Sequence, residues 1–344
     1  MPKRDPGDAM QSKGGRMLAA QATGKGLIGC TEAPSPQPGD GQALVRMELA
    51  SICGSDLHIV DYGWLADEWP LRPGYPGHEG VGVIVRPGAS GRFREGDRVL
   101  VTPQIWGSFC FAEYQAVGEA FLTPMPDPPA ESGVTLQERL MAQQLGTVIF
   151  AARRLPNLIG KTCAVMGQGS AGLFWDFVLK RLGAERVIAI EPLPHRLGIS
   201  RLYGADEQIS GTFAAATSDV QELTGGEGAD VVVEAVGSPE TLSHAIELAR
   251  PEGQIVWFGV PQTAEAYPFN FDLFFRKRVS AYSPLGAQDE PDLASFRQAL
   301  RWIDTGEINM KPVVTHSYPL SQVAEAFETA RSRQDGAVKV SLVC

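Results

Sequence analysis

Hydrophobic and polar residues follow two different patterns along this chain. From Met17 to about Thr123, short β-rich runs alternate with Gly and Pro, at residues 43–50, 80–88 and 97–102. This pattern predicts short strands joined by frequent turns, in a compact β-barrel-like domain. The Pro-rich residues 124–133 then predict a linker or surface loop, and the broad apolar face of residues 138–155 predicts a helix.

After Gly160, apolar runs of strand length alternate with amphipathic runs of helix length. Strands are predicted at 162–167, 186–191, 230–237 and 253–259, and helices at 172–183, 193–204 and 239–250. This alternation predicts a doubly wound parallel sheet, and therefore an α/β fold. Two more helices, at 294–306 and 321–332, and a last strand at 337–343 complete the chain.

Composition narrows the classes of protein that remain. Among the 344 residues 44% are hydrophobic and 20% charged, which is typical of a globular protein with a sizeable core. The net charge of -10 argues against nucleic acid and anionic membranes as partners, and no run of about 18 apolar residues could span a membrane. The five scattered cysteines do not form a disulfide framework, and the N-terminus lacks the apolar segment of a signal peptide. We therefore expect a cytoplasmic protein in which residues 1–15 form a flexible tail.

A glycine motif, G-x-G-x-x-G, joins the first strand of the α/β region to its first helix. In that context Gly167 allows a tight turn and Gly169 lets the backbone approach a pyrophosphate. Gly172 lets helix and strand pack closely, while Ser170 and Ala171 open a helix whose N-terminus faces the phosphates. The motif alone is a weak signal, but between a strand and a helix it predicts a dinucleotide site.

An acidic residue follows at the end of the next strand, about 20 residues on, where a carboxylate binds the ribose hydroxyls of NAD. This residue is Glu191, and its charge repels the additional phosphate of NADP. Arg196 lies close by and offers the opposite possibility, a partner for that phosphate. We expect NAD as the cofactor.

A second cluster of reactive residues lies in the β-rich region, in the sequences CGSDLH (53–58) and GHE (77–79). A thiolate and an imidazole brought together from separate segments suit Zn²⁺. A single Cys or His is usually an ordinary core or surface residue, and it is the clustering that indicates a metal site.

These motifs together resemble the zinc-containing medium-chain dehydrogenase family, which includes alcohol, polyol and threonine dehydrogenases. The resemblance extends over nearly the whole chain and rests on CGSDLH, GHEGVG, GDRV, FAEY, GQGSAG and EAVGSPETL, in that order. It implies a GroES-like β-barrel catalytic domain over 16–146 and 284–344, flanking a Rossmann NAD-binding domain over 147–283. The implied reaction moves a hydride between NAD and an alcohol, a polyol or the corresponding carbonyl compound.

The resemblance also implies a set of metal ligands. Cys53 and His78 match the catalytic-zinc ligands, and Glu79 matches an acid close to the zinc. Where relatives carry a third ligand, Cys or Glu, this chain has Gln143, which is neutral and weaker. The four-cysteine structural zinc lobe is missing, because its segment contains only Cys110. We therefore expect no structural zinc and at most one catalytic zinc.

Other positions match residues that serve the reaction. Asp56 matches the carboxylate that orients the ligand histidine. Ser55 and His58 match a proton relay from the substrate oxygen to solvent. Thr147 matches a threonine at the nicotinamide, and Lys339 matches a basic residue near the pyrophosphate.

Two alternative functions remain open. The first is a metal-free enone or quinone reductase of the same superfamily that uses NAD(P)H, which Gln143 favours and the retained Cys53, His78, Ser55 and His58 disfavour. The second is a non-catalytic NAD-binding sensor or scaffold, which would have no need of a proton relay. In the leading interpretation the partner is a small-molecule alcohol or carbonyl compound, and the chain forms a homodimer or homotetramer.

Overall fold

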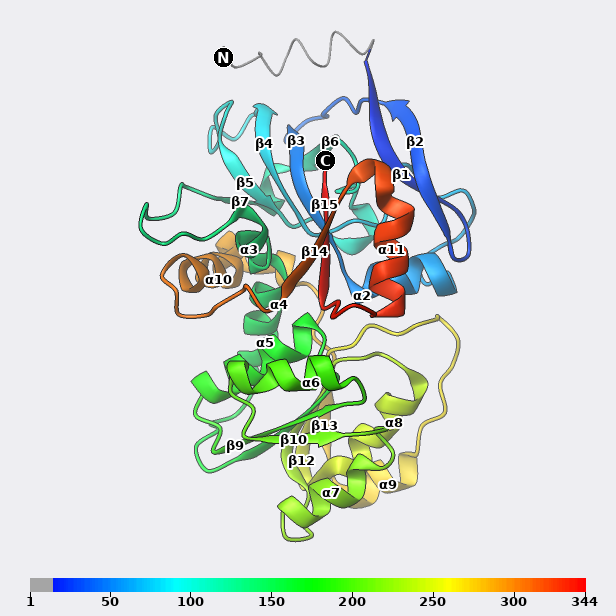
Figure 1. Cartoon of the computed structure of the whole chain (residues 1–344), viewed down its shortest axis with the longest axis vertical. Coiled ribbons are helices and arrows are strands. Elements are labelled where there is room, and N and C mark those ends of the chain that lie inside the picture. Colours follow the sequence, from blue (N-terminus) through cyan, green and yellow to red (C-terminus); the bar gives the residue numbers. More distant parts are fainter. Residues whose placement is uncertain (1–14) are drawn as a thin grey trace. The chain divides into compact units, whose positions relative to one another are not determined.

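Two units make up the structure, a computed structural model that describes residues 15–344 (Figure 1). The first unit contains the chain up to Gly146 and again from Gln288 to Cys344, and the second runs from Thr147 to Ala287. Apart from Gly15, the predicted tail lies outside the described residues. Within residues 15–344, no helix is long and apolar enough to cross a membrane.

The first unit is built on a seven-stranded sheet and a separate two-stranded hairpin. Its strands are β1 (Arg16–Gly24), β2 (Leu27–Pro34), β3 (Gln42–Ile52), β4 (Gly80–Arg86), β5 (Arg98–Val101), β6 (Tyr114–Gly118), β7 (Leu122–Pro124), β14 (Val314–Pro319) and β15 (Lys339–Val343). Strand β3 is central, because it pairs antiparallel with β4, β6 and β15. The predicted domain of short strands is confirmed.

Short helices accompany this sheet: α2 (Gly54–Leu57), α3 (Leu136–Leu140), α10 (Ala294–Asp304), α11 (Val323–Ser332) and the beginning of α4 (Ala142–Ala152). The single helix predicted over 138–155 is in fact two, with Met141 between them at φ -62° and ψ -13°. The buried Arg139 holds α3 against α10 through an ion pair with Asp304, at 2.8 Å between Nε and Oδ1. This tertiary contact leaves no trace in the apolar pattern of the segment.

The second unit is a six-stranded sheet in which every neighbouring pair is parallel. Its elements are β8 (Thr162–Met166), α5 (Ser170–Arg181), β9 (Arg186–Glu191), α6 (Pro194–Ser200), β10 (Glu207–Ser210), α7 (Ala216–Leu223), β11 (Ala229–Glu234), α8 (Pro239–Leu248), β12 (Ala249–Trp257), α9 (Phe271–Lys277) and β13 (Ser280–Tyr282). The strand order β10-β9-β8-β11-β12-β13 is that of a doubly wound dinucleotide-binding sheet, reversing between β8 and β11. The α/β prediction is confirmed.

Four elements of this unit have too little patterning to be predicted. Strands β10 and β13 have four and three residues. Helix α7 is short, and α9 contains no buried residue although it carries three phenylalanines. An element without a buried face has no reason to show the alternation of apolar and polar residues on which the prediction depends.

Candidate functional site

The sharp turn after β3 sets the first half of the candidate site. Cys53 is the N-cap of α2, with extended backbone at φ -94° and ψ 159°. Its backbone N–H donates to Asp56 Oδ2 at 2.8 Å, in a capping box. The side chain that closes the turn is therefore the carboxylate that the sequence predicted to orient a ligand.

Asp56 also joins this turn to the segment that begins β4. Its other oxygen, Oδ1, lies 2.9 Å from Nδ1 of His78, and both side chains are buried. With Asp56 accepting the Nδ1 proton, Nε2 is the ring nitrogen left to bind a metal when it is unprotonated. Ligand atoms of Cys53, His78 and Glu79 all lie within 4.8 Å of one another. A thiolate, an imidazole and a carboxylate in such proximity form a donor set that suits Zn²⁺.

Glu79 lies in a buried ionic cluster. Its Oε2 is 2.6 Å from Nζ of Lys339 and accepts a short hydrogen bond from the Ser51 hydroxyl. Burial alone would raise the pKa of Glu79 and lower that of Lys339, but their mutual attraction outweighs it and shifts both in the opposite directions. The other oxygen of Glu79, Oε1, is buried and has no hydrogen-bond partner among the residues that the structure describes. A metal ion at this place would satisfy that oxygen.

Two adjacent glutamines of α4 are buried in the same unit. Nε2 of Gln144 lies 3.7 Å from Sγ of Cys53, and its Oε1 is buried without a partner. Gln143, the position predicted from the resemblance, is also buried. Sequence reasoning missed Gln144 because successive helix residues point about 100° apart, and the motif supplied only one of the two.

The two proposed relay residues lie in consecutive helical turns. Ser55 is buried in α2, and its Oγ lies 3.4 Å from Nε2 of His78. His58 is buried at the start of a π-helical turn, His58–Tyr62. Its ring packs edge-on against Tyr62, at 5.8 Å between centroids. The contact of Ser55 with His78 places its hydroxyl beside the group of ligand atoms.

The protonation of His78 is set by its neighbours. Burial disfavours the charged imidazole, but the charge and hydrogen bond of Asp56, together with Cys53, raise the pKa of His78 well above its usual value. Because Nε2 must be unprotonated to bind a metal, a metal and a proton compete for it.

The glycine turn, residues 167–172, lies in the second unit between β8 and α5. Gly167 has a φ of +89°, and a Cβ on Gly172 would lie only 1.8 Å from the Gly167 carbonyl oxygen. A Cβ on Gly169 would meet only Nη1 of Arg196, at 3.7 Å. The protein's own packing thus requires glycine at the first and third positions but leaves room at the second, where a phosphate would approach.

The acidic residue predicted to bind ribose also stabilises this turn. Oε2 of Glu191 accepts the Gln168 N–H at 2.7 Å, and its Oε1 accepts the Leu193 N–H at 3.0 Å. Helix α5 begins at Ser170 with Gly169 as its N-cap, so no side chain caps its first N–H groups. These N–H groups are available to an anion.

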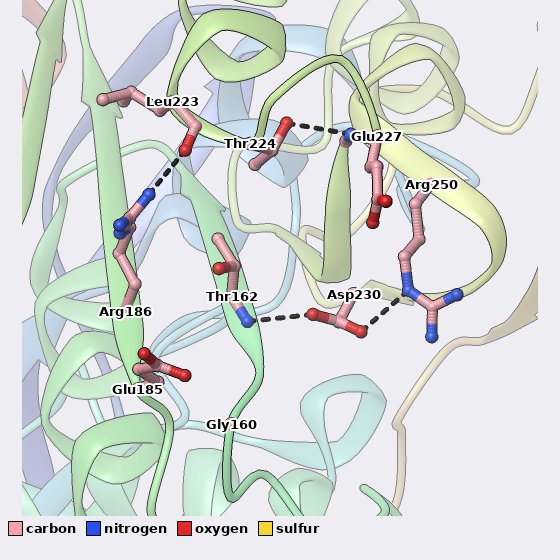
Figure 2. A pocket seen from close by; sticks show the side chains of 10 residues that line it. Gly160, Thr162, Glu185, Arg186, Leu223, Thr224, Glu227, Asp230 and Arg250 are labelled. Atoms are coloured by element: carbon pink, nitrogen blue, oxygen red, sulfur yellow. Dashed lines mark hydrogen bonds and ion pairs between the residues drawn. The ribbon is translucent and has the colours of Figure 1, made fainter.

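A hollow of this unit lies where β8 and β9 begin, at the end of the sheet opposite to the glycine turn (Figure 2). Asp230 and Arg250, two of its five charged lining residues, form an ion pair. Asp230 accepts hydrogen bonds from the Thr162 N–H at 3.0 Å and from Arg250 Nε at 2.7 Å, and it pairs with Lys161. Arg186 donates to the Leu223 carbonyl. The hollow is therefore a structural ionic cluster remote from the glycine turn.

Comparison with protein families identifies the class. Residues 39–127 match the family described as alcohol dehydrogenase GroES-like domain, and residues 172–305 match the family described as zinc-binding dehydrogenase. Together the two matches span more than half of the chain. The chain belongs to the zinc-type medium-chain dehydrogenases, which confirms the resemblance, and it is an oxidoreductase.

Individual relatives are similar to this chain over almost their full length. The chain is 29% identical to an alcohol dehydrogenase of Cupriavidus necator, over 95% of this chain and 98% of that one. It is 28% identical to an L-threonine 3-dehydrogenase of Pyrococcus horikoshii, over 94% and 98%. Among solved structures, an alcohol dehydrogenase from Thermus sp. ATN1 is 26% identical with a TM-score of 0.78, covering 95% of this chain and 99% of that one.

The buried ion pair leads to a prediction about stability. Lys339→Met should lower the free energy of unfolding at pH 7 by about 3–5 kcal/mol, because it leaves the Glu79 carboxylate buried without a counter-charge. The lowered pKa of Glu79 means that its contribution is present above the unfolded value of about 4.3 and is lost as the pH falls through the folded value. The difference in the free energy of unfolding between wild type and Lys339→Met should therefore become smaller in acid.

Urea denaturation between pH 3 and pH 8 measures this effect, because the contribution of Glu79 is lost below about pH 4.3. The matched control is Lys311→Met, at an exposed lysine. A similar loss in both variants, or a loss below about 1 kcal/mol for Lys339→Met, would show that the pair does not support the fold.

Proposed function

We propose that this chain is a dehydrogenase that moves a hydride between NAD and a small alcohol or polyol, or its carbonyl product, with one zinc ion at the catalytic site. The observation that carries the proposal is the convergence of Cys53, His78 and Glu79, with Asp56 fixing the imidazole from behind. The names of the relatives, alcohol dehydrogenase and L-threonine 3-dehydrogenase, support the substrate class.

The residues fit the two absent groups. For zinc, the thiolate of Cys53 and the imidazole of His78 are strong ligands, and the unpartnered Oε1 of Glu79 is a third. For NAD, the open face at Gly169 and the uncapped start of α5 suit the pyrophosphate. When bound, zinc supplies a Lewis acid for the substrate oxygen and NAD supplies the hydride acceptor.

The chain itself supplies the proton path. In the proposed oxidation, Ser55 accepts the proton of the substrate hydroxyl and passes it to His58, which releases it to solvent. The buried hydroxyl of Ser55, beside His78, supports this role. Asp56 holds His78 in one tautomer, so that Nε2 remains directed at the ligand group.

A metal-free reductase of the same superfamily is the second candidate. It is favoured by Gln143, a neutral residue at the position where the family resemblance implies a Cys or Glu ligand, and Gln144 beside it is also neutral and buried. Against it stands the ionic cluster around Glu79, which is costly to bury and leaves one carboxylate oxygen without a partner. A scaffold without catalysis is disfavoured by the buried relay residues.

The first prediction of this proposal concerns the metal. Protein prepared with added zinc should bind at most one ion per chain, and chelation should abolish turnover. Because a neutral amide is a weaker ligand than a carboxylate, Gln143→Glu should raise zinc retention during dialysis. Gln144→Glu is the comparison at the adjacent position. Full activity of metal-free protein would favour the metal-free reductase. Unchanged zinc retention in both variants would show that neither Gln143 nor Gln144 of α4 is a zinc ligand.

The second prediction concerns the relay. Ser55→Ala and His58→Ala should each lower kcat about 10²-fold, since a positioned acid–base group contributes at least that much. The Kd for NADH should be nearly unchanged. Ser90→Ala, at an exposed serine, is the control and should leave kcat unaltered. Near-normal turnover in both relay variants would exclude the path.

The third prediction concerns cofactor choice. The wild-type protein should have a higher kcat/KM with NAD than with NADP, because the Glu191 carboxylate repels the additional phosphate. Glu191→Ala should narrow the difference. It should also raise the KM for both cofactors, since the same carboxylate stabilises the glycine turn. Glu185→Ala, at an exposed position, is the control. A preference of the wild type for NADP would instead assign Arg196 to the phosphate.

The fourth prediction is self-association into a homodimer or homotetramer. Phe271 and Phe275 of α9 are 65% and 69% exposed, and large apolar side chains so exposed on one helix are typical of an interface. Sedimentation velocity at micromolar concentration should show an oligomer, and Phe271→Ser with Phe275→Ser should shift it toward monomer. A monomeric wild type would refute this.

A further inference from the structure

Glu234 is a buried acid that the proposed proton path does not use. It is the last residue of β11 and is completely inaccessible to solvent. Its Oε1 accepts three hydrogen bonds, from the Val236 and Gly237 N–H groups at 2.8 Å each and from the Thr241 hydroxyl at 2.7 Å. Within residues 15–344, its Oε2 has no hydrogen-bond partner. One carboxyl oxygen therefore holds the turn after β11, residues 235–237, and ties it to the start of α8.

This turn has almost no freedom to move, because it packs against the turns on both sides. A Cβ on Gly167, in the glycine turn, would lie 2.6 Å from Cγ2 of Val236. A Cβ on Gly259, which follows β12, would lie 2.3 Å from the Gly237 nitrogen and 2.8 Å from Oε2 of Glu234. The three turns thus meet at backbone distance, with the Glu234 carboxyl among them.

The position of these turns relates them to the cofactor. They follow β8, β11 and β12, which are neighbours in the parallel sheet. Ligands of such sheets bind at the carboxyl ends of the strands, across the point where the strand order reverses. The half with β8, β9 and Glu191 suits the adenosine and pyrophosphate. The half that begins with β11 is left for the nicotinamide mononucleotide.

We propose that Glu234 is a positioning residue for the nicotinamide half of the cofactor, acting through the turn 235–237. This inference rests on the proposed binding of NAD. Without the carboxyl oxygen, the Val236 and Gly237 N–H groups lose their acceptor and the Thr241 hydroxyl keeps only its contacts with Ser238, so the turn is no longer tied to α8. The adenosine half, held by Glu191 and the glycine turn, keeps its own contacts. Burial raises the pKa of Glu234 above its usual value, although the hydrogen bonds that the carboxyl accepts from Gly237 and Thr241 favour its charged form.

The test compares NADH with ADP-ribose, which lacks the nicotinamide, by calorimetric titration of the full chain. Glu234→Ala should weaken NADH about tenfold, the effect of losing one or two buried hydrogen bonds, and ADP-ribose less than about twofold. Glu234→Gln keeps the accepting oxygen and should restore NADH affinity to within about threefold of wild type. Glu240→Ala, at an exposed acid of α8, is the control.

Each outcome bears on a different claim. A parallel loss of NADH and ADP-ribose affinity, or no loss in folded Glu234→Ala protein, would overturn the role of Glu234 alone. A wild-type protein that binds neither ligand would overturn the proposed function itself. If Glu234→Ala does not fold, Thr241→Val removes one of the three donors and should give a smaller loss, about threefold, confined to NADH. Equal effects of Thr241→Val on both ligands would also overturn the inference.

Discussion

The carboxylate of Asp56 is the constraint on which the candidate metal site depends. One oxygen accepts the Cys53 N–H and the other contacts Nδ1 of His78, so a single buried group joins two segments 22 residues apart. A buried carboxylate is stable only when its oxygens are well bonded. The requirement that stabilises Asp56 therefore also fixes the direction of the thiolate and of the imidazole. The contacts that stabilise the buried carboxylate are thus the same contacts that orient the proposed ligands.

A second buried charge, Glu79, links the two segments of the chain that form the first unit. Glu79 pairs with Lys339, the first residue of the C-terminal strand β15. Strand β15 lies beside the turn of Cys53 because its Val340 pairs antiparallel with Ile52 of β3. In the second unit, close backbone packing adds to the buried carboxyls of Glu191 and Glu234. Three glycines, Gly167, Gly237 and Gly259, let adjacent turns approach within distances that no side chain would allow. Each unit thus builds its own part of the chemistry.

Much of the fold was predictable because its strongest elements are buried on a regular period. The strand of residues 162–166 and the helix that begins at Ser170 show in the apolar pattern, and so does the central strand β3. Helix α9 does not, because none of its residues is buried. The break at Met141 also escaped prediction, because the apolar pattern does not mark it, and neither does it mark the pairing of the nearby Arg139 with Asp304, 165 residues away. The apolar pattern of a segment indicates which of its residues are buried, but not which distant residues contact them.

The candidate site divides in the same way. Residue types and spacing predicted that a thiolate and an imidazole share a metal site, and that glycines open a helix suited to a dinucleotide, whereas the acid entered the predicted site through the family resemblance. Only the tertiary structure decided that Lys339 pairs with Glu79, that Gln144 contacts Cys53, and that the carboxyl of Glu234 joins three turns. The reason is physical. A motif specifies which groups are close along the chain, whereas the partner of a buried charge or amide is whatever the sheet register brings within a few ångströms of it.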